Sequence, residues 1–282
     1  MCPSTSASTS RRGTCASTTS CLPEREALRR PSVIRRSAIR VALAVTLAAV
    51  GSHAEPIALV TLGDSLTQGD GDEAGGGYPP KLLERLKTDH PGSTLENLGQ
   101  SGWTSDDLIN TQLEPALAAL RAAPAGAKKI ALVWIGSNDL FGLYNWSCDE
   151  DYANDFAACE RDGLRSFEAN IAKIIGSLHA TGAKLFVAIL DDQSKRPVIT
   201  DEALRSASFD KFSAGDVPRM AAQLVRYNDA IREQAARQGA TTVDFLHTTI
   251  FEKAATLSED GNHPNAAGYR EIARIWHEAI SQ

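Results

Sequence analysis

Three polar residues have the types and surroundings that nucleophilic catalysis needs. Asp260 and His263 are three residues apart, so the carboxylate can accept the imidazole Nδ1–H and leave Nε2 free as a general base. An apolar run leads directly into the segment Gly63-Asp64-Ser65. A serine hydroxyl needs such a base because it is a weak nucleophile at neutral pH. The alternative is that Ser65 only caps a helix and that the Asp–His pair belongs to a surface turn.

Two further polar segments contain hydrogen-bond donors. Gly102 lies in residues 97–104 and has no Cβ, so its backbone N–H can approach a ligand closely. Asn138 lies in residues 136–139 and carries an amide NH₂. Together with the Ser65 N–H these groups are three donors, enough for an oxyanion hole. The alternative for each segment is an ordinary turn, because Gly and Asn both favour turns.

Near-continuous apolar runs alternate with amphipathic stretches, which is typical of parallel strands covered on both faces. The predicted strands are residues 57–62, 94–98, 130–135, 185–190 and 241–245. The predicted helices are residues 78–89, 105–123, 164–181, 217–238 and 266–280. This order predicts a doubly wound α/β domain with a parallel sheet over residues 55–282. The polar segments all follow strands, on the side where the ligand crevice of such a sheet lies.

The charge of the chain is unevenly distributed. The 282 residues carry a net charge of −6, with 43% hydrophobic and 23% charged residues. Residues 1–54 contain eight arginines and two glutamates, a balance of +6, so residues 55–282 carry −12. Phosphate binding needs a basic face, so this acidic body argues against nucleic acid and against anionic membranes as partners.

The N-terminal segment has the composition of a signal peptide. An arginine cluster in residues 29–40 precedes an apolar run over residues 41–50 and small residues up to Ala54. We therefore expect residues 1–54 to be a leader cleaved near Ala54, and the protein to be periplasmic or extracellular. Ten apolar residues are too few to span a bilayer, which takes roughly 20. The alternative is a buried N-terminal helix.

Residues 55–282 retain two of the five cysteines, Cys148 and Cys159. Two cysteines in one polar loop of an exported protein predict a disulfide, and two free thiols are the alternative. Neither cysteine has a partner at C-x-x-C spacing, so zinc is not expected.

Two long connections, residues 136–163 and 191–216, follow strand ends and are candidates for substrate contacts. Four side chains of the first are predicted to wall an acyl pocket: Phe141, Leu143, Tyr144 and Trp146. The alternative is that they pack this loop onto the sheet. The second connection is polar, and the sequence leaves open whether it is a mobile lid.

Four sequence blocks resemble, in order, the conserved blocks of the GDSL, or SGNH, hydrolases. They are GDSLTQG, NLGQSGWTS, IGSND and DGNHP, and the resemblance spans about residues 57–280. The closest likeness is to small bacterial secreted esterases of the thioesterase and lysophospholipase type. The resemblance implies a flavodoxin-like, three-layer α/β/α sandwich with a five-stranded parallel sheet in the order 2-1-3-4-5.

The same resemblance implies a role for each candidate residue. Ser65 would be the nucleophile, His263 the base and Asp260 its orienting carboxylate, with Ser65, Gly102 and Asn138 forming the oxyanion hole. The expected activity is hydrolysis of carboxylic esters of short to medium acyl chains through an acyl-enzyme, without metal or organic cofactor. Thioesters and lysophospholipids are further candidate substrates.

Two other functions stay open. One is a carbohydrate O-acetylesterase that acts on polysaccharide or peptidoglycan, and the other is a non-catalytic ligand-binding module on the same scaffold. The expected partner is therefore a small-molecule, lipid or glycan ester. The sequence does not indicate an oligomeric state.

Overall fold

A five-stranded parallel sheet forms the centre of the fold. The computed structural model describes residues 54–209 and 211–282, so the predicted leader lies outside the described residues except for Ala54. The strands are β1 (Ile57–Gly63), β2 (Thr94–Asn97), β3 (Lys128–Trp134), β4 (Lys184–Ile189) and β5 (Thr241–Asp244). They run in the order β2-β1-β3-β4-β5, which confirms the predicted fold class and strand order.

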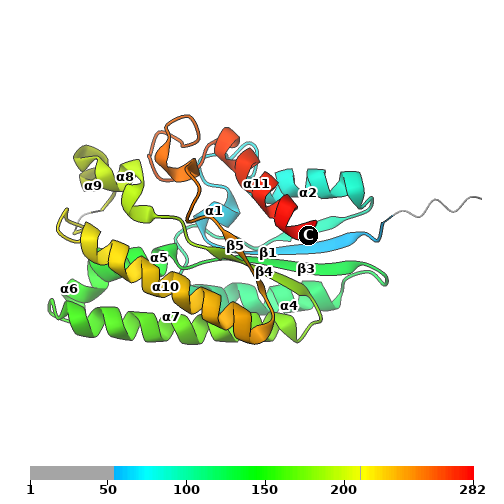
Figure 1. The fold of residues 1–282 in the computed structure, drawn as a ribbon, viewed down its shortest axis with the longest axis horizontal. Coiled ribbons are helices and arrows are strands. Elements are labelled where there is room, and N and C mark those ends of the chain that lie inside the picture. Colours follow the sequence, from blue (N-terminus) through cyan, green and yellow to red (C-terminus); the bar gives the residue numbers. More distant parts are fainter. Residues whose placement is uncertain (1–53, 210) are drawn as a thin grey trace, which may run out of the picture. The chain divides into compact units, whose positions relative to one another are not determined.

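Helices cover both faces of this sheet and make it the middle of three layers (Figure 1). One face carries α2 (Tyr78–Asp89) and α11 (Ala266–Ile280), which pack on each other. The other face carries α4 (Leu113–Arg121), α7 (Phe156–His179) and α10 (Val217–Gln238). The shorter helices lie in the connections: α1 (Ser65–Gln68), α3 (Ser105–Asp107), α5 (Ser137–Gly142), α6 (Cys148–Glu150), α8 (Pro197–Thr200) and α9 (Glu202–Ser208).

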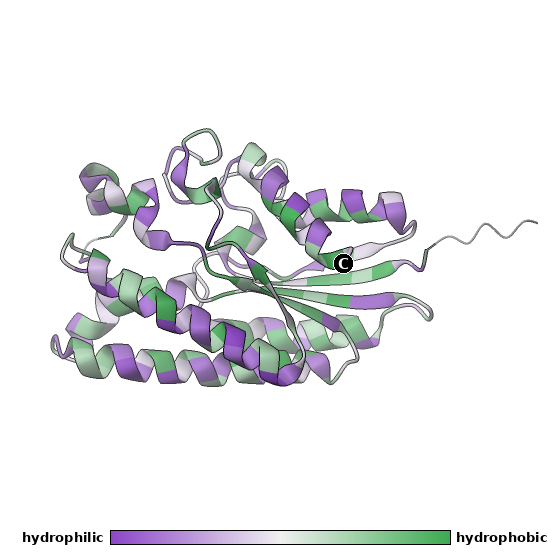
Figure 2. Ribbon diagram, viewed as in Figure 1, coloured by the Kyte–Doolittle hydropathy of each residue, from purple (hydrophilic) through white to green (hydrophobic). Residues whose placement is uncertain are grey.

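The burial of the strands follows their position in the sheet. All seven residues of β1 are buried, because this strand has a neighbour on each side and helices on both faces. The edge strands β2 and β5 are largely exposed, which explains why their sequences are more polar. Figure 2 shows the hydrophobic residues concentrated on the inner strands, whereas the long helices alternate between hydrophobic and hydrophilic residues. No helix among the described residues is both long enough and apolar enough to cross a membrane.

The predicted helix boundaries differ from the observed ones in two places. Helix α7 begins at Phe156, eight residues before the prediction, because Cys159 is the one buried residue in its first turns and the apolar stripe that marks the rest starts later. Asp155 caps this start by accepting the Ala158 N–H at 3.1 Å. The predicted helix over residues 105–123 is interrupted by a π-helical turn at 108–112.

Candidate active site

The structure brings Ser65, His263 and Asp260 into one hydrogen-bonded chain. His263 Nε2 lies 2.9 Å from Ser65 Oγ, and His263 Nδ1 lies 2.6 Å from Asp260 Oδ2. Because the carboxylate can only accept, the imidazole donates from Nδ1 and its Nε2 is left to accept the serine proton. Ser65 and His263 are almost 200 residues apart in the sequence: Ser65 follows β1, and Asp260 and His263 lie in the connection from β5 to α11.

Asp260 also holds the turn that carries the histidine. Its Oδ1 accepts from Ser258 Oγ at 2.6 Å and from the backbone N–H groups of Asn262 and His263 at 2.8 and 2.9 Å. Partial burial raises the pKa of the Asp260 carboxyl, but the hydrogen bonds from His263, Ser258 and the two backbone groups outweigh it. The net result is a pKa well below the usual range, so Asp260 is an anion throughout the neutral range.

The end of β1 presents Ser65 at a tightly packed turn. A Cβ on Gly63 would collide with the Trp134 carbonyl oxygen of β3, so only glycine fits there. Gln112 also holds the backbone of Gly63, donating to Gly63 O at 2.7 Å and accepting from the Gly63 N–H at 2.9 Å. Gln112 was not singled out from the sequence, since an amide in an amphipathic helix is an ordinary residue there.

Asp64, the residue before the serine, is fully buried. Its Oδ1 caps α1 by accepting the Leu66 N–H at 3.0 Å, and its Oδ2 has no partner among the described residues. Burial raises the pKa of Asp64 to about 7, against the opposing effects of the Leu66 N–H and of the positive charges on Arg196 and His263. Asp64 therefore titrates near neutral pH, directly beside the candidate nucleophile.

The two segments that carry the candidate oxyanion donors are joined to each other. Asn138 Nδ2 donates to the Trp103 carbonyl at 2.9 Å, which leaves its second N–H for a ligand. Gly102 has a left-handed backbone with φ of 79°, and no atom lies within 4 Å of the place where a Cβ would be. The loop is tied to α1 because the N–H of the neighbouring Ser101 donates to Gln68 Oε1 at 2.7 Å.

A further carboxylate, Asp139, braces the same two segments. Its two oxygens accept from the Ser105 backbone N–H at 2.8 Å and from Ser105 Oγ at 2.5 Å. Asn170 of α7 donates to that hydroxyl at 3.0 Å. Burial raises the pKa of Asp139 to about 6, despite the hydrogen bonds from Ser105. Asp139 is part of the IGSND block, and its bracing role follows only from the tertiary contacts.

The beginning of the polar connection 191–216 is buried beside the turn that carries Asp260 and His263. Arg196 and Asp191 are each only 2% exposed and form a bidentate ion pair. Arg196 Nε lies 2.8 Å from Asp191 Oδ2, and Arg196 Nη2 lies 2.7 Å from Asp191 Oδ1. Arg196 Nη1 also donates to Asn262 Oδ1 at 2.7 Å, and the Val198 N–H donates to Gly261 O at 3.0 Å. This part of the connection is therefore anchored to the turn of His263 and is not a free lid.

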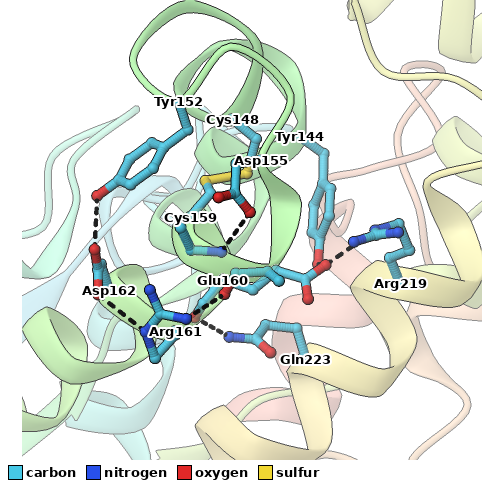
Figure 3. The surroundings of a disulfide bond; sticks show 12 residues. Tyr144, Cys148, Tyr152, Asp155, Cys159, Glu160, Arg161, Asp162, Arg219 and Gln223 are labelled. Atoms are coloured by element: carbon cyan, nitrogen blue, oxygen red, sulfur yellow. Dashed lines mark hydrogen bonds and ion pairs between the residues drawn. A yellow bond between two sulfur atoms is a disulfide. The ribbon is translucent and has the colours of Figure 1, made fainter.

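The predicted disulfide joins Cys148 to Cys159, with a Cα–Cα distance of 5.4 Å, which confirms that prediction. Both cysteines are fully buried. The next residue, Glu160, accepts hydrogen bonds from Tyr144 Oη and from Arg219 Nε of α10, both at 3.0 Å (Figure 3). The disulfide and Glu160 thus link the start of α7 to the loop before it and to α10.

The four predicted pocket residues fall into different environments. Phe141, Leu143 and Tyr144 are buried, and only Trp146 is exposed, at 45%. The Phe141 ring stacks on Phe209 at 5.1 Å between centroids, so it packs one long connection against the other. Phe141 thus contacts the other long connection, and the acyl pocket walled by the four residues stays a prediction.

Leu143 borders a cavity of about 550 Å³ beside the segments that carry Gly102 and Asn138. The polar residues Thr104, Asp106, Asp139 and Asn170 also line this cavity. Thr104 is two residues after Gly102 on the same loop. Among the described residues, no group of three His, Cys, Asp or Glu side chains is arranged to hold a metal ion.

The fold and the site together define a class. A parallel α/β sheet presents a Ser–His–Asp chain and two loops with potential oxyanion donors at its carboxyl edge, as a serine hydrolase does. The sequence matches the GDSL-like lipase/acylhydrolase family over residues 61–271, which is most of the chain. The protein therefore belongs to this family of carboxylic ester hydrolases, as its sequence blocks predicted.

Several known proteins are similar over nearly their whole length. YpmR of Bacillus subtilis, described as uncharacterized, is 22% identical over 235 residues, which are 81% of this chain and 83% of YpmR. The acetylxylan esterase Axe2 of Geobacillus stearothermophilus is 18% identical with a TM-score of 0.54, covering 82% of this chain and 96% of Axe2. The psychrotrophic esterase EstA of Pseudoalteromonas sp. is 16% identical with a TM-score of 0.55, and the match covers 79% of this chain and 96% of EstA. At these identities the structural likeness shows the fold.

Proposed function

We propose that this protein is a serine ester hydrolase that cleaves carboxylic esters of short to medium acyl chains through an acyl-enzyme. The observation that carries the proposal is the unbroken chain from Asp260 through His263 to Ser65, with contacts of 2.6 and 2.9 Å. Such a chain activates a hydroxyl that is otherwise a weak nucleophile. It distinguishes this proposal from a non-catalytic binding module, which has no need of an activated serine.

In the proposed reaction, His263 Nε2 takes the Ser65 proton while Oγ attacks the ester carbonyl. The oxyanion accepts hydrogen bonds from the N–H groups of Ser65 and Gly102 and from Asn138 Nδ2. The carbonyl re-forms, the bond to the leaving alcohol breaks, and that oxygen receives the proton from Nε2. Water then attacks the acyl-enzyme by the same route and releases the acid. Asp260 keeps the proton on Nδ1 throughout.

The test is an initial-rate series with p-nitrophenyl acetate, butyrate, octanoate and palmitate. We expect the purified protein to hydrolyse the shorter esters and Ser65→Ala to be inactive. Ser206→Ala, an exposed serine of α9, is the matched control and should keep the wild-type rate. Equal rates for the wild type and Ser65→Ala would refute the proposed nucleophile. Activity on palmitate that exceeds activity on acetate would refute the chain-length assignment.

A carbohydrate O-acetylesterase is the second candidate, and the polar cavity beside the oxyanion segments favours it. Hydroxyl, amide and carboxylate groups of Thr104, Asn170 and Asp106 suit the hydroxyls of a sugar better than an alkyl chain. Acetate release from acetylated xylan or peptidoglycan, with poor activity on butyrate and longer esters, would decide for this candidate. Thioesters and lysophospholipids are tested as further substrates in the same series.

We also propose that the protein is exported. The basic and apolar segments before Ala54 support this proposal, and so does the buried disulfide, because disulfides persist in oxidising compartments. The test is expression of the full chain in a bacterial host, followed by fractionation and N-terminal sequencing. A mature protein that begins at Glu55 outside the cytoplasm is expected, and an uncleaved cytoplasmic protein would refute the proposal.

A further inference from the structure

Asn262, the residue before the catalytic histidine, has a side chain whose orientation is set by its surroundings. Its Oδ1 lies 2.7 Å from Arg196 Nη1. A guanidinium has donors only, so the amide atom that faces it must be the oxygen. The Nδ2 group therefore points the opposite way, where it lies 3.4 Å from His263 Nε2.

The group that sets this orientation is itself rigid. The Arg196 guanidinium is held by Asp191 through two N–O contacts, at 2.8 and 2.7 Å, and lies over the Phe251 ring at 4.6 Å. Arg196 and Asp191 are almost completely buried. The backbone of Asn262 is fixed as well, because its N–H donates to Asp260 Oδ1 at 2.8 Å. Flipping the amide would place its NH₂ against the guanidinium, which is unfavourable because two donors would then face each other without an acceptor.

The Asn262 NH₂ is poorly satisfied in this position. The lone pair of His263 Nε2 is directed to the Ser65 hydroxyl at 2.9 Å, and a distance of 3.4 Å is long for a hydrogen bond. During the reaction the leaving oxygen must come within about 3 Å of Nε2 to receive its proton. An N–H beside Nε2 is then within reach of that same oxygen.

We propose that Asn262 is a further catalytic residue, whose Nδ2–H donates a hydrogen bond to the leaving-group oxygen as the ester bond breaks, and that Arg196 is the positioning residue that aims it. The inference rests on the proposed ester hydrolysis. The bond stabilises the alkoxide that develops before proton transfer from Nε2 is complete. In deacylation the attacking water occupies the same place, and the bond orients its oxygen.

This role makes a prediction that a merely structural role does not. A donor to the leaving oxygen matters most when that oxygen becomes strongly basic, as in an alkyl ester, and least when it is a good leaving group. Acetate esters of p-nitrophenol, phenol, trifluoroethanol and ethanol give the same acyl-enzyme and differ only in the leaving group. The measured quantity is kcat/KM, which reports acylation, normalised to the active fraction titrated with a fluorophosphonate.

We expect Asn262→Leu to lose less than about threefold on p-nitrophenyl acetate and roughly 10- to 100-fold on ethyl acetate. This difference makes kcat/KM depend more steeply on the basicity of the leaving group. Asn262→Asp keeps the acceptor for Arg196 and removes the donor, so it should show the same steeper dependence. It keeps the test available if the leucine variant folds poorly. Arg196→Lys has no planar guanidinium to contact both Asp191 and Asn262. It should therefore show a smaller increase in the leaving-group dependence of kcat/KM. Asn110→Leu, which replaces an exposed amide, is the matched control and should have the wild-type kcat/KM on all four acetates.

Two results would overturn the inference. An equal loss on all four acetates would mean that Asn262 only supports the position of His263. An unchanged rate on ethyl acetate in both Asn262 variants would mean that the amide does not contact the leaving group. Failure of the proposed function itself gives a different result, because Ser65→Ala would then equal the wild type on p-nitrophenyl acetate.

Discussion

Replacing Asp260 separates its two tasks, the orientation of the imidazole and the support of the turn. In Asp260→Asn the amide oxygen can still accept from Ser258, Asn262 and His263, as Oδ1 does now. The amide NH₂ then faces His263 Nδ1 in place of Oδ2. Nδ1 must become an acceptor, so the proton moves to Nε2, which can no longer take the Ser65 proton.

We expect kcat to fall about 10⁴-fold in Asp260→Asn, the loss that follows from a wrong tautomer in other serine hydrolases. This loss corresponds to about 5 kcal/mol of transition-state stabilisation at 1.36 kcal/mol per factor of ten. Stability should change little, because the three contacts to Oδ1 are kept. Asp260→Ala loses those contacts as well, and at about 1 kcal/mol each for a partly exposed group it should unfold about 2–3 kcal/mol more easily.

The assay combines kcat on p-nitrophenyl acetate with urea unfolding of both variants. Asp244→Asn is the matched control, since Asp244 contacts His247 Nδ1 at 2.7 Å with the same three-residue spacing but on an exposed pair. It should keep the wild-type rate. An Asp260→Asn variant within tenfold of the wild-type kcat would refute the tautomer argument. Equal stabilities of Asp260→Asn and Asp260→Ala would refute the assigned support of the turn.

Three further perturbations test other parts of the site. Asn138→Ala should lower kcat by about 10²–10³ with an unchanged fold by circular dichroism, because one oxyanion donor is lost; a kcat near wild type would exclude that role. Cys148→Ser/Cys159→Ser should lower the unfolding free energy by roughly 3 kcal/mol in urea titrations, and we expect altered chain-length preference or rate; unchanged values of both would show that the bridge does not stiffen the substrate region. Asp64 has a folded pKa of about 7, above its ordinary 3.8, so the unfolded chain ionises first and stability falls as pH rises from about 4 to 7. Asp64→Asn should abolish this pH-dependent part of the unfolding free energy, which is on the order of 4 kcal/mol. Parallel curves of stability against pH for the two proteins would contradict the raised pKa.

Local pattern was enough to predict the sheet and most of the helices. The buried strands β1, β3 and β4 read as continuous apolar runs because helices cover both faces. Helices α10 and α11 were predicted with their observed bounds, since their apolar stripes begin and end where the helices do. The early part of α7 was missed because Cys159 is buried through a disulfide and not through an apolar stripe.

The candidate residues were predicted because each follows a strand end in a short polar block. Parallel strands bring their carboxyl ends to one edge, so Ser65, Asn138 and His263 had to lie on the same side of the sheet. What the sequence alone determined is therefore the fold class, the family and the residues that meet.

Only the tertiary structure decided which polar residues are buried. Asp191 and Arg196 belong to a connection that the sequence marks only as polar, yet their mutual charge compensation allows both to lie in the interior beside Asn262. Phe141 and Tyr144 were predicted to wall an acyl pocket, and the structure adds that both are buried and that their rings contact Phe209 and Phe212 of the other long connection. Whether a charge is buried or a ring is exposed depends on partners that are distant in the chain. The local sequence pattern does not identify those partners.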